Sequence, residues 1–344
     1  MNITVNGAQC TEIKEIRKVA SKEFSDFVEE FYNEKKYIIA HTSGSTGEPK
    51  EIHLLKEDMI ESAKLTNDFF KLTTDSLFYL CLSPHYIAGK MMIVRCLILN
   101  AKICEVTPSN APLDTYDGSE MIDLIALVPS QIIYLLNNPD KRALIKDMII
   151  GGGAVSEKLN KRMSELSLSA FATYGMTETC SHVALAAVTL PVSPFKALGN
   201  VTFSLDERGC LVIHTPQFHN KTIVTNDIVE LISNTDFFWK GRYDNVINTG
   251  GIKVFPEEIE KKLVPLLSHS KYYITSIPSD KWGNDVALAV EYPNLKEDKK
   301  IGEINPALIE KMKSILSEYE IPKHYIALKN IPLTSSGKII REKR

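Results

Sequence analysis

Short apolar runs alternate with segments of helical character between residues 77 and 173, and this alternation restricts the fold more than any other feature of the chain. The apolar runs have the length of strands and lie at 77–82, 102–106, 124–128, 148–150 and 169–173. Between them, helices are predicted at 89–100, 130–137 and 156–166. Strands joined through helices run parallel, and a parallel sheet needs helices on both faces. We therefore predict an α/β protein whose large N-terminal part is a parallel or mixed sheet covered by helices.

The pattern changes on either side of this region. Ahead of it, apolar residues with helical spacing predict an amphipathic helix: Phe24, Phe27, Val28 and Phe31. From about residue 183 to 238 the apolar runs become short and alternating, which predicts an antiparallel or barrel-like β piece. After Arg242 we predict the order β-α-β-β-α-β, with a strand near 246, a helix at 256–267, strands at 271–277 and 286–292, a helix at 306–317 and a strand at 324–328. The chain is therefore expected to form two domains, residues 1–242 and a small α+β domain of residues 243–344 that acts as a mobile lid.

Charge, hydropathy and cysteine spacing exclude several classes of protein. The chain has 40 basic and 43 acidic residues, so no basic surface is expected to attract nucleic acid or an anionic membrane. The longest apolar stretch, residues 91–99, contains Arg95 and is too short to span a bilayer. The first residues do not resemble a signal peptide, and the six cysteines include no C-x-x-C pair. We expect a cytoplasmic protein with reduced thiols and without membrane insertion.

The run HTSGSTGEPK at residues 41–50 follows an apolar stretch and is suited to hold phosphate. Gly44 and Gly47 allow backbone N–H groups to turn toward an anion. Further donors and a positive charge come from side chains of the same run: Thr42, Ser43, Ser45, Thr46 and Lys50. A Walker A loop requires a lysine directly after its last glycine, whereas Lys50 follows Gly47 by three residues. The run predicts a nucleotide triphosphate site of another kind, and the alternative is an ordinary surface loop.

Three further motifs contain residue types that suit phosphate chemistry. TYGMTET at residues 173–179 follows a predicted strand, and the carboxylate of Glu178 beside hydroxyls is suited to hold Mg²⁺ against phosphate oxygens. GRYDN at 241–245 and TGGIKVFPEE at 249–258 lie at the proposed domain junction. PLTSSGK at 332–338 places Lys338 near the end of the chain, where it would approach a phosphate when the lid closes.

In their order along the chain, these four motifs resemble those of the adenylate-forming enzymes, which include acyl- and aryl-CoA ligases, luciferases and the adenylation domains of peptide synthetases. The resemblance covers the chain from about residue 37 to its end. It implies that a carboxylate attacks the α-phosphate of ATP to give an acyl-adenylate and pyrophosphate, after which the thiol of CoA displaces AMP. Such steps need charge stabilisation more than proton transfer. The resemblance therefore implies ATP, Mg²⁺ and CoA as partners.

The same resemblance assigns roles to residues at the matching positions. Lys338 would bridge the carboxylate and the α-phosphate, Glu178 would bind Mg²⁺, and Thr177 would contact phosphate. The nucleoside would be held by the backbone of Gly152, Gly153 and Ala154, by stacking on Tyr174, and by Asp227 and Arg242 at the ribose. Asp244 would be the hinge of the lid, and Gly250 and Gly251 would line the path of CoA. Four of these residues or pairs have an alternative. Lys338 is otherwise a solvated lysine near the chain end, and Glu178 a capping or surface residue. Asp227 follows Asn226 instead of the family's glycine and suits a turn, and Gly250-Gly251 is also a turn sequence.

Three shorter stretches resemble the 2-succinylbenzoate-CoA ligases of menaquinone biosynthesis more closely than other members. They are PHYIAG at 84–89 followed by Arg95, VPSQ at 128–131, and YGMTETCSH at 174–182. Arg95 matches the arginine that binds a substrate carboxylate in those ligases, and an unpaired guanidinium in an apolar helix would otherwise be costly. The alternative for Arg95 is an internal ion pair. His85 and Tyr86 are predicted to border the pocket for an aromatic dicarboxylate.

Two departures from the family keep other functions open. The segment ahead of the phosphate run is about forty residues and shorter than in most relatives, and Glu51 stands where relatives commonly carry glycine. The leading hypothesis is a 2-succinylbenzoate-CoA ligase, followed by another acyl- or aryl-CoA ligase and by a catalytically silent nucleotide-binding protein. The sequence does not decide between a monomer and a homodimer.

Overall fold

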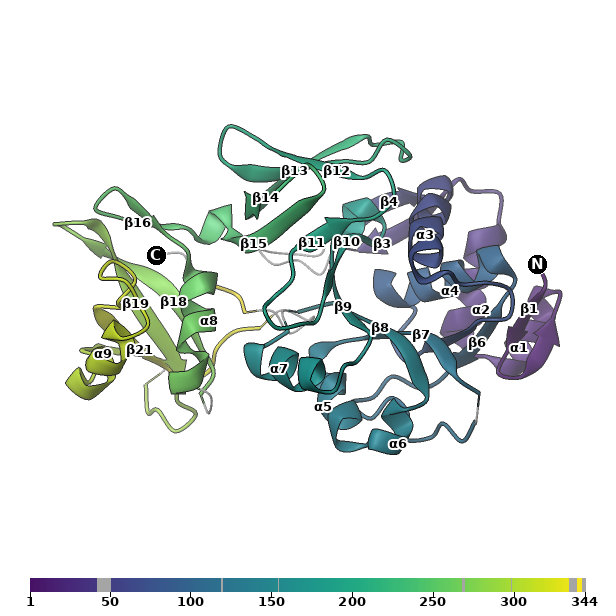
Figure 1. Ribbon diagram of the computed structural model, residues 1–344, viewed down its shortest axis with the longest axis horizontal. Coiled ribbons are helices and arrows are strands. Elements are labelled where there is room, and N and C mark those ends of the chain that lie inside the picture. Colours follow the sequence, from purple (N-terminus) through teal and green to yellow (C-terminus); the bar gives the residue numbers. More distant parts are fainter. Residues whose placement is uncertain are drawn as a thin grey trace.

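The computed structural model describes residues 1–41, 51–118, 120–153, 155–267, 270–297, 299–333 and 339–341. Within these ranges thirteen strands form one large sheet, four form a second sheet, and two hairpins stand apart. The second sheet lies at one end of the long axis of the molecule, and the first strands of the chain lie at the other (Figure 1). No helix in the described ranges combines the length and the apolar character needed to cross a membrane.

The large sheet has a parallel half and an antiparallel half that meet at strand β9. Its strand order is β12-β13-β14-β15-β11-β10-β9-β8-β7-β5-β6-β1-β2. The strands from β9 to β1 are parallel neighbours, and β2 closes that edge antiparallel: β9 (Ala170–Gly175), β8 (Ile145–Ile150), β7 (Ile122–Leu127), β5 (Leu77–Leu80), β6 (Lys102–Glu105), β1 (Ile3–Val5) and β2 (Ala8–Cys10). The other strands pair antiparallel: β10 (His182–Ala187), β11 (Phe195–Ala197), β12 (Thr202–Leu205), β13 (Cys210–His214), β14 (Thr222–Leu231) and β15 (Asp236–Arg242). The predicted fold class is confirmed.

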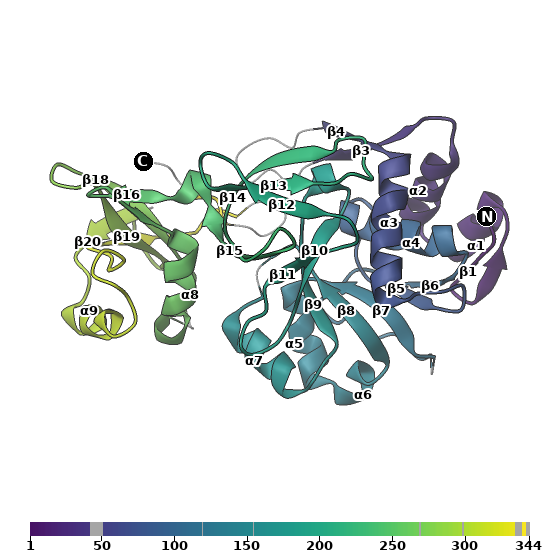
Figure 2. The ribbon, with the colours of Figure 1, turned by 45° about the horizontal axis from the view of Figure 1, so that its top comes forward.

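Helices cover both faces of the parallel half, as its apolar strands require. Side chains of β5 alternate, so that Phe78 and Leu80 enter one core and Leu77 and Tyr79 enter the other. One face is covered by α1 (Ile13–Val19), α2 (Lys22–Tyr32), α3 (Lys56–Phe70) and α4 (Ile87–Leu99), and the opposite face by α5 (Pro129–Asn137) and α7 (Glu157–Glu165). The short helix α6 (Pro139–Arg142) follows α5 and buries no residue. Figure 2 shows the two groups of helices on opposite sides of β5–β9.

Local sequence sets several helix boundaries. The side chain of Ser21 accepts a hydrogen bond from the N–H of Phe24 at 3.1 Å and caps α2. Pro129 occupies the first turn of α5, where its missing N–H is not needed, and Gln131 accepts a hydrogen bond from the N–H of Val128 at 3.0 Å. The predicted helices at 89–100 and 130–137 are therefore found within two residues of the expected bounds.

Several elements near the N-terminus were not predicted. They are the short strands β1 and β2, helices α1 and α3, and strand β4 (Glu51–Leu55). Strand β4 forms a hairpin with β3 (Tyr37–His41), which is the strand expected ahead of the phosphate run. The face of α3 that enters the core includes Ser62, Thr66 and Asn67, so the apolar periodicity that marks a helix is interrupted. Strands of three residues, such as β1, are too short to show an alternating pattern.

The second sheet has its own core and differs in detail from the predicted order. Its strands are β18 (Tyr272–Ser279), β19 (Gly283–Glu291), β20 (Lys299–Gly302) and β21 (His324–Leu328), in the spatial order β18-β19-β21-β20. Helices α8 (Pro256–Leu267) and α9 (Pro306–Lys313) pack on it, and β16 (Ile247–Thr249) pairs with β17 (Ile252–Val254) as a separate hairpin. The prediction β-α-β-β-α-β was wrong in omitting β17 and β20, whose mostly exposed residues give no apolar run. The division into domains at residue 242 and the mobility of the second part stay predictions.

Candidate functional site

Loops at the carboxyl ends of the parallel strands carry many of the predicted site residues. Because β5, β7, β8 and β9 are parallel neighbours, the loops that follow them meet at one edge of the sheet, where open α/β sheets bind ligands. These loops contain His85 and Tyr86 after β5, Gly152 and Gly153 after β8, and Thr177 and Glu178 after β9. Ala154 lies outside the described residues. The sheet topology thus brings three of the predicted groups to a common edge.

The predicted phosphate run connects the strands of the β3–β4 hairpin. All of its predicted contact residues lie outside the described residues: Thr42, Ser43, Gly44, Ser45, Thr46, Gly47 and Lys50. The flanking strands pair as far as His41 and Glu51, and β4 contacts the 3-10 helix η1 (Thr177–Thr179). The carboxylate of Glu51 lies 2.9 Å from Nε2 of His53 on its own strand. Strand β4 of the hairpin therefore lies beside the 3-10 helix that contains Glu178, and the phosphate contacts of the run stay predictions.

Glu178 and Thr177 form the start of η1, directly after β9. Glu178 is exposed and Thr177 is half-buried, so both side chains are accessible to a ligand. The described part of the chain contains no group of three or more His, Cys, Asp or Glu side chains that could hold a metal ion. A Mg²⁺ ion at Glu178 would therefore need further oxygen ligands, such as phosphate oxygens of a nucleotide.

Asp227 on β14 is the centre of a buried polar cluster. Its Oδ2 accepts a hydrogen bond from the hydroxyl of Tyr174 at 2.8 Å, and its Oδ1 accepts one from Nε1 of Trp239 at 3.1 Å. Nη1 of Arg242 lies 3.6 Å from the same Oδ1. Asp227 is thus a strand residue rather than a turn aspartate, and three side chains orient its carboxylate. Whether it binds ribose stays a prediction.

Tyr174 packs among aromatic rings beside this carboxylate. Its ring centroid lies 5.0 Å from that of Phe237 and 5.7 Å from that of Phe195. Burial, followed by the neighbouring charge of Asp227, raises the pKa of Tyr174 well above its ordinary value, so the hydroxyl remains a donor. The predicted stacking of Tyr174 on adenine is not tested by these contacts and stays a prediction.

Arg242 links Asp227 to the predicted hinge. Its Nη2 lies 3.5 Å from Oδ2 of Asp244. Asp244 is in the 3-10 helix η2 (Tyr243–Asn245), which along the chain lies between the large sheet and the second sheet. The amide of Asn226 donates a hydrogen bond to the same Oδ2 at 3.4 Å. Two carboxylates therefore flank one guanidinium at the junction, and the hinge role of Asp244 stays a prediction.

Arg95 on α4 is a fully buried cation, with 1% of its surface exposed. Its Nη2 donates a hydrogen bond to Oγ of Ser181 at 2.8 Å, and its Nη1 lies 3.7 Å from Sδ of Met92. Its Nε has no hydrogen-bond partner among the described residues, and no carboxylate in these ranges pairs with it. Burial lowers the pKa of Arg95 from 12.5 to about 9. The alternative of an internal ion pair is therefore not found within the described ranges.

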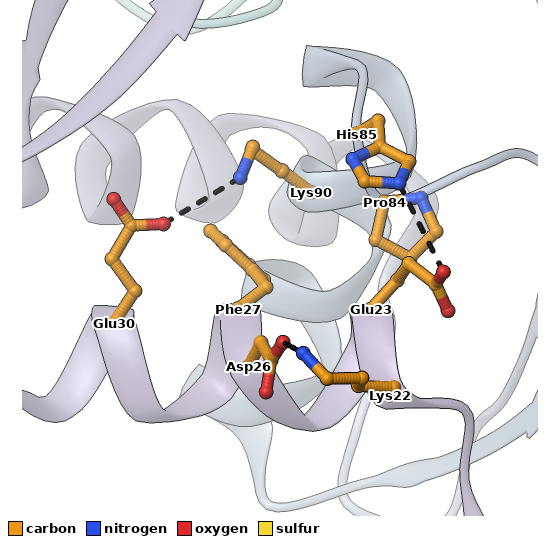
Figure 3. A pocket seen from close by; sticks show the side chains of 8 residues that line it. All are labelled: Lys22, Glu23, Asp26, Phe27, Glu30, Pro84, His85 and Lys90. Atoms are coloured by element: carbon orange, nitrogen blue, oxygen red, sulfur yellow. Dashed lines mark hydrogen bonds and ion pairs between the residues drawn. The ribbon is translucent and has the colours of Figure 1, made fainter.

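His85 and Tyr86 lie at the start of α4 and face outward. Tyr86 is 57% exposed, and His85 borders a pocket of about 200 Å³ between α2 and α4 (Figure 3). In this pocket Nζ of Lys90 lies 3.6 Å from Glu30 and 4.4 Å from the ring centroid of Phe27. Arg95 is not part of its lining. The structure does not bring His85 and Arg95 into one described pocket, so their joint role at the acid stays a prediction.

Gly250 and Gly251 form the two-residue turn of the β16–β17 hairpin. Their φ angles are +60° and +83°, as is typical of tight hairpin turns that favour glycine. A Cβ atom on Gly250 would lie 2.6 Å from the ring of Trp282. The turn alone therefore accounts for both glycines, and their contact with CoA stays a prediction.

Lys338 lies outside the described residues, but its neighbours along the chain are well anchored. Leu333 and Ile339 form an antiparallel bridge. Arg341 donates a hydrogen bond from Nη2 to Oε2 of Glu260 on α8 at 2.8 Å. The described residues on either side of the segment that carries Lys338 therefore pair with each other, and Arg341 ties the chain to α8.

Several residues of the site were missed by sequence reasoning. Trp239 orients Asp227, while Ser181, His182 and Thr66 form a polar chain beside Arg95. Ser181 and His182 end the stretch YGMTETCSH, so their proximity to Glu178 was visible in the sequence. Their contact with α3 and α4 was not, because it joins residues 86 and 116 positions apart.

Comparison with known proteins gives three informative likenesses. A solved structure of an acyl-CoA synthetase (AMP-forming)/AMP-acid ligase II-like protein from Dyadobacter fermentans is 32% identical with a TM-score of 0.60, covering 92% of this chain and 91% of that chain. The 2-succinylbenzoate–CoA ligase of Bacillus cereus is 23% identical over 354 residues, covering 93% of this chain and 72% of that protein. The o-succinylbenzoate CoA synthetase of Bacillus subtilis, solved with its acyl-adenylate intermediate, has a TM-score of 0.75 at 20% identity over 88% of this chain and 67% of that chain, a likeness of fold.

The family model of AMP-binding enzymes matches residues 3–210, which is more than half of the chain. The matched region contains the parallel half of the large sheet and the motif around Glu178. The resemblance inferred from the four motifs is thereby confirmed, and the chain belongs to the family of AMP-binding enzymes.

Proposed function

We propose that the protein is a 2-succinylbenzoate–CoA ligase that uses ATP. In the first step a carboxylate of the acid would attack the α-phosphate of ATP, forming the acyl-adenylate and releasing pyrophosphate. In the second, the thiol of CoA would attack the acyl carbon, forming the thioester and releasing AMP. Family membership supports the adenylation chemistry, and relatives named 2-succinylbenzoate–CoA ligase support this acid.

The choice of acid rests on Arg95, which is buried and has no carboxylate partner among the described residues. A buried guanidinium with a free Nε and no described carboxylate partner is costly unless an anion joins it. A planar guanidinium pairs best with a planar carboxylate through two hydrogen bonds. An acid with two carboxylates can use one for the reaction and present the other to Arg95. A monocarboxylate would leave the guanidinium unpaired.

The positions of other residues support the roles that we propose for them at the nucleotide. The buried carboxylate of Asp227 has lone pairs left for ribose hydroxyls, and exposed Gly152 and Gly153 leave room for an adenine beside them. Exposed Glu178 suits a Mg²⁺ ion that is otherwise held by phosphate oxygens, and such an ion would neutralise phosphate charge. Thr177 would contact the same phosphates.

Residues from the second part of the chain would complete the site. We propose that residues 243–344 move about Asp244, so that Lys338 reaches the α-phosphate in one position and Gly250-Gly251 reaches CoA in another. A positive charge at Lys338 would stabilise the charge that develops during adenylation. Replacing Lys338 should therefore block the first step and leave the fold intact.

The test is pyrophosphate release from ATP and Mg²⁺ with 2-succinylbenzoate and with a panel of other acids, each with and without CoA. CoA-dependent turnover confined to 2-succinylbenzoate is the expected result. Turnover only on fatty acids or simple benzoates would contradict the proposal. ATP binding without pyrophosphate release for every acid would instead indicate a nucleotide-binding protein.

A second candidate is another acyl- or aryl-CoA ligase. The relative from Dyadobacter fermentans favours it, because that protein matches this chain almost end to end at 32% identity and carries only a general acyl-CoA synthetase name. The same acid panel distinguishes the two candidates. Under the second, activity would be found with a different acid.

A further inference from the structure

The loop that joins β9 to β10 has a tightly constrained conformation. A Cβ atom on Gly175 would lie 2.2 Å from the carbonyl oxygen of Ser181 and 2.5 Å from Cα of His182, so only glycine allows this approach. The hydroxyl of Thr179 accepts a hydrogen bond from the N–H of Met176 at 2.9 Å and lies 2.6 Å from the carbonyl of Ser181. The loop therefore holds Ser181 and His182 in one place relative to the sheet.

From this loop a chain of hydrogen bonds runs between α4 and α3. Oγ of Ser181 lies 2.8 Å from Nη2 of Arg95 and 3.3 Å from Nδ1 of His182, and Nε2 of His182 lies 3.1 Å from Oγ1 of Thr66. Oγ1 of Thr66 lies 3.4 Å from the carbonyl of Ser62. Every member except the last carbonyl is a side chain, and Arg95, His182 and Thr66 are all at least 95% buried.

The donor and acceptor properties of these groups allow the hydrogen bonds to run in only one direction. A guanidinium can only donate, so Ser181 must accept from Arg95 and has its own O–H left for Nδ1 of His182. A neutral histidine with its proton on Nε2 then donates to Thr66, whose hydroxyl donates to the carbonyl of Ser62. A charged histidine would place a second donor against Ser181 and a second cation near Arg95. Burial, followed by the charge of Arg95, lowers the pKa of His182 well below its ordinary value and keeps it neutral.

These hydrogen bonds orient the guanidinium of Arg95 without pairing all of its donors. Ser181 contributes one neutral oxygen to Nη2, while Nε of Arg95 has no partner among the described residues. An ordinary structural arginine would be expected to have its donors paired and its charge balanced. The arrangement fixes the plane of the guanidinium and leaves donors for an anion.

We propose that Ser181 and His182 are positioning residues that set the selectivity for a dicarboxylate by holding the guanidinium of Arg95 toward its second carboxylate. This inference rests on the proposed function of Arg95. It also means that one loop serves both ends of the reaction, because exposed Glu178 and half-buried Ser181 are three residues apart. Selectivity for the acid would then depend on side chains that do not contact it.

The experiment compares two acids in pyrophosphate release: 2-succinylbenzoate and a matched acid that keeps the reacting carboxylate but lacks the second one. Ser181→Ala should lower kcat/KM for the dicarboxylate about tenfold or more, mainly through KM, and change it less than about twofold for the monocarboxylate, because a hydrogen bond to a charged group is lost. Ser181→Thr, which retains the hydroxyl, should restore the selectivity. Ser62→Ala, at a buried serine of α3 that contributes only its carbonyl, is the matched control and should leave it unchanged.

Combining Ser181→Ala with Arg95→Met distinguishes a failure of the function proposed for Arg95 from a failure of the positioning role proposed for Ser181. If Arg95→Met abolishes the selectivity and Ser181→Ala adds nothing to it, both residues act on the same carboxylate. If Arg95→Met leaves the selectivity unchanged, the proposed function of Arg95 fails. If Arg95→Met abolishes it but Ser181→Ala lowers activity on both acids equally, only the positioning role is overturned. Should Ser181→Ala not fold, His182→Gln and Thr66→Val interrupt the same chain and must reduce the selectivity for the inference to stand.

Discussion

Replacing Arg95 with methionine is expected to stabilise the folded protein while removing recognition of a second carboxylate. Burial lowers the pKa of Arg95 from 12.5 to about 9. A difference of about 3.5 in pKa corresponds to a cost of about 5 kcal/mol for the charged form in the folded state. This cost is fully present below about pH 9, where the folded and unfolded states both hold the proton, and is relieved only as the pH rises from about 9 to 12.5. At neutral pH the variant therefore removes the whole cost.

The loss of one hydrogen bond offsets part of this gain. The charge-assisted bond from Arg95 to Ser181 contributes about 1.5–3 kcal/mol, and methionine has a similar length and fits an apolar helix. The free energy of unfolding should therefore rise by about 2–3.5 kcal/mol. Buried charges replaced by apolar side chains often show gains of this size.

Urea denaturation at about pH 7.5, followed by tryptophan fluorescence, measures the change. Lys146→Met is the matched control, because Lys146 is an exposed cation whose Nζ lies 3.2 Å from Asp123, and it should change stability by less than about 0.5 kcal/mol. An Arg95→Met variant that is less stable than the wild type would refute the reasoning. It would mean that the guanidinium already has a counter-charge in the protein without substrate.

Three further changes test other parts of the structure. Gly175→Ala should destabilise the protein by about 1–3 kcal/mol in urea denaturation, since its Cβ would lie 2.2 Å from a backbone oxygen. The control Gly302→Ala has open space around its Cβ and should be nearly neutral. Equal effects of the two substitutions would contradict the close approach at Gly175. His182→Gln should reduce the loss of stability that the wild type shows below about pH 6.5. Because the folded state keeps the pKa of His182 low, the unfolded state binds the proton first and the free energy of unfolding falls as the pH falls. If the difference in urea midpoint between about pH 5 and 7 were the same in the variant and the wild type, this reasoning would be contradicted. Asp227→Asn should weaken ATP binding about tenfold or more in calorimetry while the thermal midpoint stays close to that of the wild type. Unaltered ATP binding would mean that Asp227 does not contact the nucleotide.

Some of the candidate site was predictable because its residues lie close together in the sequence. The TYGMTET motif begins within the last three residues of β9, so Glu178 was expected at a strand end, and Gly250-Gly251 was expected to suit a turn. Asp227 was harder, because Thr225-Asn226-Asp227 reads as a turn and its burial depends on Trp239 and Tyr174 from other strands. Arg95 stood out because a charged residue in an apolar helix requires an explanation.

What the sequence alone determined is the order of elements and their chemistry: the alternation that makes a parallel sheet, the glycines and hydroxyls of the phosphate run, and a lone arginine among apolar residues. These properties depend on neighbours within a few positions, which periodicity and motif spacing record. The tertiary structure decided that β1 extends the sheet beside β6, that α3 belongs to the core despite its polar face, and that Ser181, His182 and Thr66 lie beside Arg95. Such contacts join segments as many as 116 residues apart and arise only when the sheet brings its helices and loops together, so no local pattern contains them.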